Sequence, residues 1–127
     1  MSEKNFCPFC DGDDERIVKN DLAFAIYDTN PASPGHALIM PNRHIAEYFE
    51  ASREEKIAML ELVDEMKQAI DKKHSPDAYN IGVNVGEVAG QSVPHIHIHI
   101  IPRYKGDVED PRGGVRGVIP KKQKYNK

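Results

Sequence analysis

Three histidines alternate with isoleucines late in the chain, at His95, His97 and His99. Side chains alternate between the two faces of an extended segment, so we expect the three rings on one face, with successive rings about 7 Å apart. The intervening isoleucines are expected on the other face, in the core. A solvated polar face normally uses Thr, Lys, Ser or Glu, so three histidines in register indicate a functional surface.

Two kinds of chemistry suit such a row of histidines. Alternate imidazoles can coordinate a catalytic metal ion. Alternatively, a neutral imidazole, with a pKa of about 6.5, is a nucleophile at pH 7 and can divide phosphoryl or nucleotidyl transfer into two steps. The preceding Gly90, Gln91 and Ser92 are small or offer neutral donors, which suit phosphate oxygens better than a metal's ligand shell. The neighbours therefore favour attack on phosphorus.

The only two cysteines, Cys7 and Cys10, have C-x-x-C spacing and form a second candidate site. Both thiolates can reach one tetrahedral ion at about 2.3 Å, but they supply only half of a structural zinc site, so histidines would have to complete it. A redox pair and two idle thiols are the rival interpretations. A thioredoxin-like pair is expected between a strand and a helix, whereas a turn-like acidic run follows here at residues 11–14, which favours zinc.

The elements that must position these groups are predicted from apolar patterning. Runs bounded by turn residues predict strands at residues 22–27, 37–41, 80–85 and 95–101. A capping-box sequence begins at Ser52, and apolar residues follow it at spacings of three and four, which predicts one long helix. The order of strands, helix and further strands indicates an α+β domain with a mostly antiparallel sheet.

Proline and glycine mark the boundaries of these elements. The helix is expected to end near His74, ahead of Pro76, and loops are expected at residues 30–35 and 87–94. Beyond Pro102, further glycines and prolines predict an irregular arm.

Size and charge restrict the possible partners. The 127 residues suit one domain, and no apolar run approaches the ~18 to 20 residues of a membrane-spanning helix. The start of the chain lacks the features of a secretory signal, so we expect a cytoplasmic protein with reduced thiols. Residues 1–101 carry 9 Lys or Arg against 17 Asp or Glu, whereas residues 102–127 carry 8 against 3. Residues 1–101 are acidic, and the basic tail has few aromatic residues. Both features argue against nucleic acid as a partner and favour a small anionic ligand.

The run HIHIHII at residues 95–101 resembles the histidine triad pattern, in which histidines alternate with hydrophobic residues. The similarity extends through GQSVP and PR on either side, and upstream through NIGVNVGEVAG, PGHALIMPNRHI and YDTNP, over most of residues 5–104. The chain is thereby similar to the histidine triad (HIT) family of nucleotide hydrolases and transferases, in its zinc-bearing branch.

This resemblance implies a HIT-like α+β fold with a mostly antiparallel sheet of about five strands, one long helix and a short one, assembled as a two-fold dimer. Residues 1–127 would form a single HIT domain. Residues 1–12 would be a CxxC zinc knuckle, and residues 102–127 a basic, irregular C-terminal arm.

The resemblance also implies an enzyme that attacks the α-phosphate of a nucleotide and hydrolyses a covalent nucleotidyl-histidine. His97 would be the nucleophile, and its other ring nitrogen should donate to a main-chain carbonyl, which keeps the attacking nitrogen unprotonated. His99 would hold the phosphate oxygens. Gln91 and Ser92 would be the neutral donors at the bridging oxygen and the phosphate.

Further residues are matched to substrate binding by the same resemblance. Asn84 would contact phosphate through its amide, and Asp28 would accept hydrogen bonds from the ribose hydroxyls. Phe24 and Ile26 are candidates for the base pocket, and His36 borders the site. Zinc, as a structural cofactor, would be held by four residues, namely Cys7, Cys10, His44 and His95.

The implied substrate is a nucleoside phosphate derivative, either a dinucleoside polyphosphate such as diadenosine tri- or tetraphosphate, or an adenosine phosphoramidate. Transfer of the nucleotidyl group to phosphate, as in a phosphorylase, is an alternative, and so is a nucleotide-binding module without turnover. Deadenylation of DNA ends would need a DNA-binding appendage that 127 residues do not contain.

Overall fold

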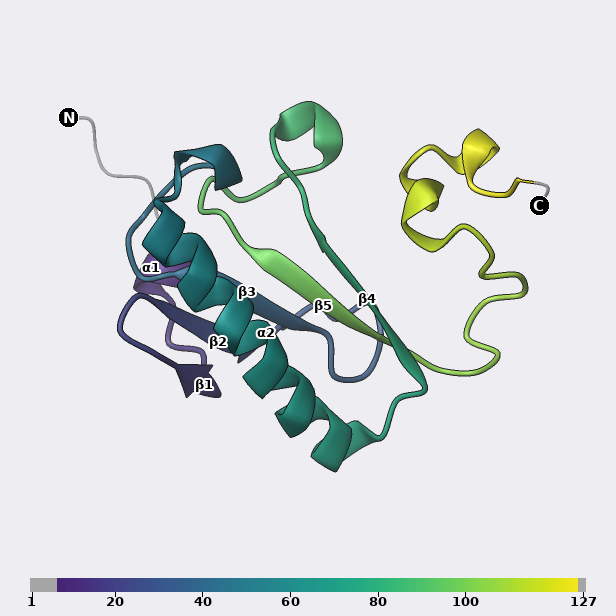
Figure 1. The fold of residues 1–127 in the computed structure, drawn as a ribbon, viewed down its shortest axis with the longest axis horizontal. Coiled ribbons are helices and arrows are strands. Elements are labelled where there is room, and N and C mark those ends of the chain that lie inside the picture. The colour runs from purple at the N-terminus through teal and green to yellow at the C-terminus, as the bar shows by residue number, and fades with distance from the viewer. Residues whose placement is uncertain (1–6, 126–127) are drawn as a thin grey trace.

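The computed structural model describes residues 7–125, whose centre is a five-stranded antiparallel sheet in the order β1-β2-β3-β5-β4 (Figure 1). The sheet is assembled from short strands with mostly apolar sequences, as expected for pleated segments that are half or fully buried. The strands are β1 (Val18–Lys19), β2 (Ala23–Tyr27), β3 (Ala37–Pro41), β4 (Ala78–Val83) and β5 (Ile98–Arg103).

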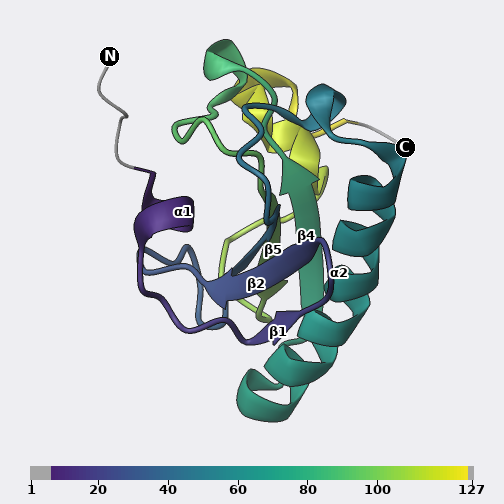
Figure 2. The same cartoon turned by 90° about the vertical axis from the view of Figure 1, so that its left-hand side faces the viewer.

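The long helix α2 (Arg53–His74) lies across one face of this sheet (Figures 1 and 2). It begins with a complete capping box, in which the Ser52 hydroxyl accepts from the Glu55 amide and the Glu55 carboxylate accepts from the Ser52 amide. It ends at Ser75, whose φ of 52° is left-handed. The predicted helix is therefore confirmed at both ends.

The two faces of the sheet are covered differently. On the α2 face, apolar side chains of the helix pack against β2, β3 and β5 in the main core, around Met59, Leu62, Met66, Ile39, Ile98 and Ile100. The opposite face carries a second, smaller apolar cluster of Phe24, Ile26, Leu38 and Met40. Because Leu38 is paired with His99 across β3 and β5, this smaller cluster and the histidine lie on the same face.

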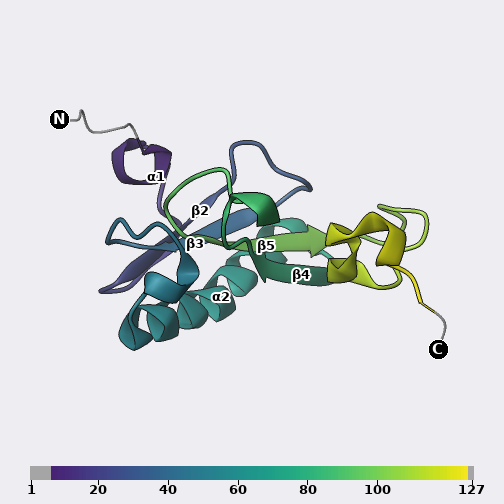
Figure 3. The same ribbon diagram turned by 90° about the horizontal axis from the view of Figure 1, so that it is seen from above.

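Short helical turns complete the described chain: α1 (Pro8–Asp11), η1 (Tyr48–Glu50), η2 (Glu87–Ala89), η3 (Gly114–Val118) and η4 (Pro120–Lys122). Figure 3 shows α1 at one end of the sheet and the C-terminal arm, with η3 and η4, at the other. The predicted knuckle and arm also include residues 1–6 and 126–127, which lie outside the described residues. Between residues 7 and 125, no helix is both long and apolar enough to cross a bilayer.

The α+β architecture agrees with the sequence-based prediction, but several boundaries differ. The strand expected at 80–85 lies two residues earlier, and the two-residue β1 was not predicted because so short a pair has no periodicity to detect. The arm expected from residue 102 begins later, since β5 runs through Pro102 to Arg103.

The strand predicted at 95–101 is wrong over its first three residues, because β5 begins at Ile98. There the main chain turns away from the ladder: the His95 amide donates to the carbonyl of Val93, and the Ile96 amide donates to the carbonyl of Ile45. The ring centroids of His97 and His99 are consequently 4.9 Å apart, closer than regular strand geometry predicts.

Candidate active site and metal centre

His97 lies just before β5 and is 8% exposed. Its Nδ1 is 2.9 Å from the carbonyl oxygen of His95. A carbonyl can only accept, so Nδ1 carries the proton and Nε2 keeps its lone pair. Burial lowers the pKa of His97 below its usual value, whereas the hydrogen bond to the carbonyl raises it. The ring is thus a fixed, neutral imidazole with one basic nitrogen.

His99 is oriented by His36, which immediately precedes the neighbouring strand β3. The Ala32 amide donates to His36 Nδ1 at 2.9 Å, so the proton of the neutral His36 ring is on Nε2. This Nε2 lies 3.0 Å from His99 Nδ1 and therefore donates to it, which leaves the proton of His99 on its own Nε2. Burial lowers the pKa of both rings, that of His99 to about 4. His99 is thus a neutral donor next to the basic nitrogen of His97.

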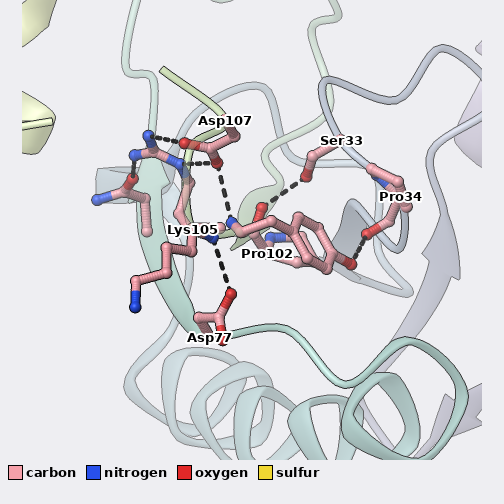
Figure 4. Close-up of polar contacts among 9 residues, drawn as sticks. Ser33, Pro34, Asp77, Pro102, Lys105 and Asp107 are labelled. Atoms are coloured by element: carbon pink, nitrogen blue, oxygen red, sulfur yellow. Dashed lines mark hydrogen bonds and ion pairs between the residues drawn. The ribbon is translucent and has the colours of Figure 1, made fainter. Parts of the chain in front are cut away.

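The loop that supplies the Ala32 amide is tied to the end of β5 (Figure 4). The hydroxyl of Ser33 donates to the carbonyl of Pro102 at 2.7 Å, and the Tyr104 hydroxyl donates to the carbonyl of Pro34. Gly35 has a φ of 91°, and a side chain there would meet His74. The Pro-Gly turn and these two hydrogen bonds therefore fix the backbone that sets the proton position of His36.

Two cysteines and two histidines converge at the other end of the histidine run. The Sγ and Nδ1 atoms of Cys7, Cys10, His44 and His95 all lie within 4.8 Å of one another. Three of the four sulfur to nitrogen distances are 3.3 to 3.5 Å, and the two Nδ1 atoms are 3.2 Å apart. A tetrahedral zinc ion at usual bond lengths would give edges of about 3.5 Å and about 3.3 Å. The donor set and its spacing fit zinc.

The surroundings of the two histidine ligands also fit a metal. His95 Nε2 is 2.9 Å from the carbonyl oxygen of Pro41 and donates to it, so its Nδ1 is unprotonated and faces the thiols. Next to His44, the guanidinium of Arg43 donates twice to Glu55, at 2.9 and 3.0 Å. These bonds lower the pKa of the Glu55 carboxyl, and they tie the loop that carries His44 to the start of α2.

Comparison with known proteins identifies the family, since the HIT domain matches residues 11–106. The chain belongs to the HIT family. It is 38% identical over 100 residues to adenosine 5'-monophosphoramidase hnt1 of Schizosaccharomyces pombe, covering 77% of this chain and 72% of that protein. It is 37% identical over 94 residues to the bis(5'-nucleosyl)-tetraphosphatase [asymmetrical] of the same yeast, covering 74% of this chain but about half, 52%, of that protein.

A solved HIT structure adds a metal to the comparison. The zinc-bound histidine triad family protein from Mycobacterium smegmatis matches with a TM-score of 0.71 at 31% identity, covering 80% of this chain and 77% of that one. The HIT-like fold expected from the sequence, with its five-stranded sheet and long helix, is therefore confirmed.

Within this HIT domain, several residues matched to substrate binding lie around the histidines. Asp28 directly follows β2, and its Oδ2 is 3.7 Å from His36 Nε2. Asn84 lines a cavity of about 450 Å³ together with His36 and His99. Phe24 and Ile26 are buried in the small apolar cluster on the same face of the sheet. An apolar floor, a carboxylate and an amide thus border the imidazoles.

Gln91 and Ser92 are less directly placed than the sequence suggested. The amide nitrogen of Gln91 donates to the carbonyls of Ala46 and Val93, and its oxygen accepts from the Gly86 amide. The side chain therefore holds its own loop and ties it to the segment at Ala46. Ser92 is exposed on that loop.

Two features of this HIT site were not predicted from the sequence. Phe9, between the cysteines, packs against the small apolar cluster, and its ring centroid is 5.0 Å from that of His97. Val115 and Val118 of the arm line the cavity that His99 and Asn84 share. An aromatic residue between two cysteines was the only available signal for Phe9, and the arm's valines gave none.

Proposed function

We propose that this HIT chain is a nucleotidyl hydrolase that acts through a covalent nucleotide on His97. The proposal rests on which ring nitrogens carry the protons of two neighbouring histidines. His97 holds its proton on Nδ1 against the carbonyl of His95, and His99 holds its proton on Nε2 because His36 occupies its Nδ1. A nucleophile and a hydrogen-bond donor are thereby fixed side by side.

The reaction proceeds in two displacements at the α-phosphorus. Nε2 of His97 attacks phosphorus, and the bond from phosphorus to the leaving group breaks with its electron pair on the leaving group. Water then attacks the same phosphorus, the bond to nitrogen breaks, and a nucleoside monophosphate leaves. In both steps the N–H of His99 donates to the phosphate oxygens as negative charge redistributes.

The surrounding residues favour a nucleotide as substrate. Asp28 would accept hydrogen bonds from the ribose hydroxyls, Asn84 would contact phosphate, and the apolar floor with Phe24 and Ile26 would contact the base. The two yeast relatives are named for a dinucleoside tetraphosphate and an adenosine monophosphoramidate. We therefore propose dinucleoside polyphosphates or nucleoside phosphoramidates as the substrate class.

Zinc is proposed as a structural cofactor, held by the four converging donors of the metal centre: Cys7, Cys10, His44 and His95. When bound, it would supply a cross-link between the N-terminal segment and the two histidines. The zinc-bound HIT protein from M. smegmatis supports zinc as the metal, and the spacing of the four donors supports their assignment as its ligands.

A two-fold dimer is proposed as the assembled state. Ile57 and Leu60 on α2 are 45% and 60% exposed, and Ile81 on the sheet-edge strand β4 is 50% exposed. Exposed apolar side chains on a helix and on an edge strand suit a self-complementary interface. Light scattering of the purified chain tests this proposal, with twice the mass of 14.3 kDa expected.

The catalytic proposal is tested with a panel of dinucleoside polyphosphates and nucleoside phosphoramidates, each ranked by kcat/KM. The panel is run with and without inorganic phosphate, since a phosphorylase would form a nucleoside diphosphate instead of a monophosphate. Rapid acid-free quenching followed by peptide mass analysis should find a nucleotide on His97. Nucleotide binding without any product would reject a hydrolase and favour a binding module.

A further inference from the structure

Phe9 connects the metal centre to the catalytic histidine. It lies on α1, between the two thiols, and its ring centroid is 5.6 Å from that of His95 and 5.0 Å from that of His97, in edge-to-face geometry. The same ring packs against the apolar cluster that includes Phe24. One aromatic side chain therefore touches a metal-centre histidine, the nucleophile and the apolar floor of the site.

The main-chain hydrogen bonds around Phe9 are local. In this segment the amide of Cys7 donates to the Asp11 carboxylate, the amide of Asp11 to the carbonyl of Cys7, and the amide of Gly12 to the carbonyl of Pro8. All these bonds stay within residues 7–12. Among the described residues, the segment contacts the loop residues His44 and His95 through its thiols, and it contacts the sheet's small apolar cluster through the ring of Phe9.

We propose that the segment Cys7–Asp11 is a metal-dependent wall of the nucleotide site, such that metal binding docks Phe9 beside His97 and thereby strengthens nucleotide binding. This inference rests on the proposed nucleotide site, but it does not depend on turnover. The two thiols must be drawn to His44 and His95 for α1 to lie where it does, and Phe9 follows because it lies between them. A nucleotide in contact with Phe9 would in turn hold α1 in place.

Thermodynamic linkage makes the proposal quantitative. If zinc tightens nucleotide binding by some factor, then the nucleotide must tighten zinc binding by the same factor. Couplings between sites are typically about 5- to 150-fold, and contact through a single aromatic ring suggests the lower end, about 5- to 20-fold.

The experiment uses the whole chain in zinc-loaded and metal-stripped forms. The Kd of AMP is measured for both by calorimetry, and zinc affinity is measured by chelator competition with and without AMP. We expect the two coupling factors to agree, at five or more. In Phe9→Ala we expect weaker zinc binding, because the packing of the ring against the apolar cluster is lost, and a coupling factor near one. Phe49→Ala is the matched control, since Phe49 is 71% exposed, and it should keep the full coupling.

A second variant reports docking without any nucleotide. The chain has no tryptophan, so Phe9→Trp introduces a single indole, which can be excited apart from the five tyrosines. Its emission should shift to shorter wavelength on adding zinc, because the indole moves from solvent onto the apolar cluster.

Three results would overturn the inference: equal AMP affinity with and without zinc, full coupling in Phe9→Ala, or no zinc-dependent change in Phe9→Trp emission. Coupling without turnover of any substrate would reject the proposed hydrolase and leave the inference standing. Turnover without coupling would do the reverse.

Discussion

His95 and His97 are two residues apart in one motif, and they hold their protons on opposite ring nitrogens. His95 donates from Nε2 to the carbonyl of Pro41, so its Nδ1 faces the thiols. His97 donates from Nδ1 to the carbonyl of His95, so its Nε2 is the basic atom. In each ring, the main-chain carbonyl that accepts the hydrogen bond determines which nitrogen is protonated and which is left unprotonated. The position of the accepting carbonyl, more than the residue type, therefore determines whether a histidine of this run acts as a metal ligand or as a nucleophile.

The largest expected effect is on the nucleophile side of this comparison. His97→Ala should lower kcat/KM by about 10⁴-fold or more, because no other basic nitrogen takes its place. Steady-state assays measure this loss, and zinc content should stay at the wild-type value. Activity within tenfold of the wild type would remove His97 from its proposed role.

The next effect is on the metal side. Cys10→Ser should weaken zinc binding by more than about 100-fold, because a thiolate is lost from the donor set, and it should lower the thermal midpoint. Chelator competition and thermal melts provide the two readouts. Ser92→Ala, on an exposed loop, is the control and should change neither. Unchanged zinc affinity in Cys10→Ser would contradict the ligand assignment.

A smaller effect on kcat is expected when the hydrogen bond between His36 and His99 is removed. His36→Ala should lower kcat roughly 10- to 100-fold, because His99 Nδ1 loses the donor that fixes its proton on Nε2. His36→Gln should recover part of the loss, since its amide can donate from a similar position. Equal activities for the two variants, compared at saturating substrate, would argue against this hydrogen-bond chain.

The smallest effect is on pH dependence. Burial, with help from His97 and His36, lowers the pKa of His99 to about 4, while Asp28 opposes the shift. Between about pH 6.5 and pH 4 the unfolded chain therefore binds more protons at this residue, so the stability that neutral His99 contributes falls as pH is lowered through this window. Thermal midpoints measured across this range should fall less steeply for His99→Gln than for the wild type. Parallel curves would refute the shift.

Local patterns predicted most of the fold. The capping box at Ser52 and the apolar spacing after it suffice to define α2, and β2 and β3 are bounded by turns that the sequence marks. The path of residues 95–97 was not predictable in this way. It depends on the carbonyl of Ile45, far away in sequence, which draws the Ile96 amide out of the ladder.

The sequence predicted which residues form the candidate site better than it predicted how they are arranged. The resemblance named His36 and His99, but the hydrogen bond from the Ala32 amide that fixes both tautomers arises from a folded loop. Phe9 was missed because its neighbours, Phe24 and Ile26 among them, come from another part of the chain. Gln91 matched a motif, yet its amide nitrogen donates to the main-chain carbonyls of Ala46 and Val93.

The histidines of the run differ in which ring nitrogen is protonated. Long-range ¹H–¹⁵N NMR of the ¹⁵N-labelled, zinc-loaded chain at pH 7.5 tests this difference most directly. The predicted spectrum has His97 protonated on Nδ1 with a basic Nε2, and both His95 and His99 protonated on Nε2. A spectrum in which His97 is protonated on Nε2, or in which the three rings share one tautomer, would contradict the account.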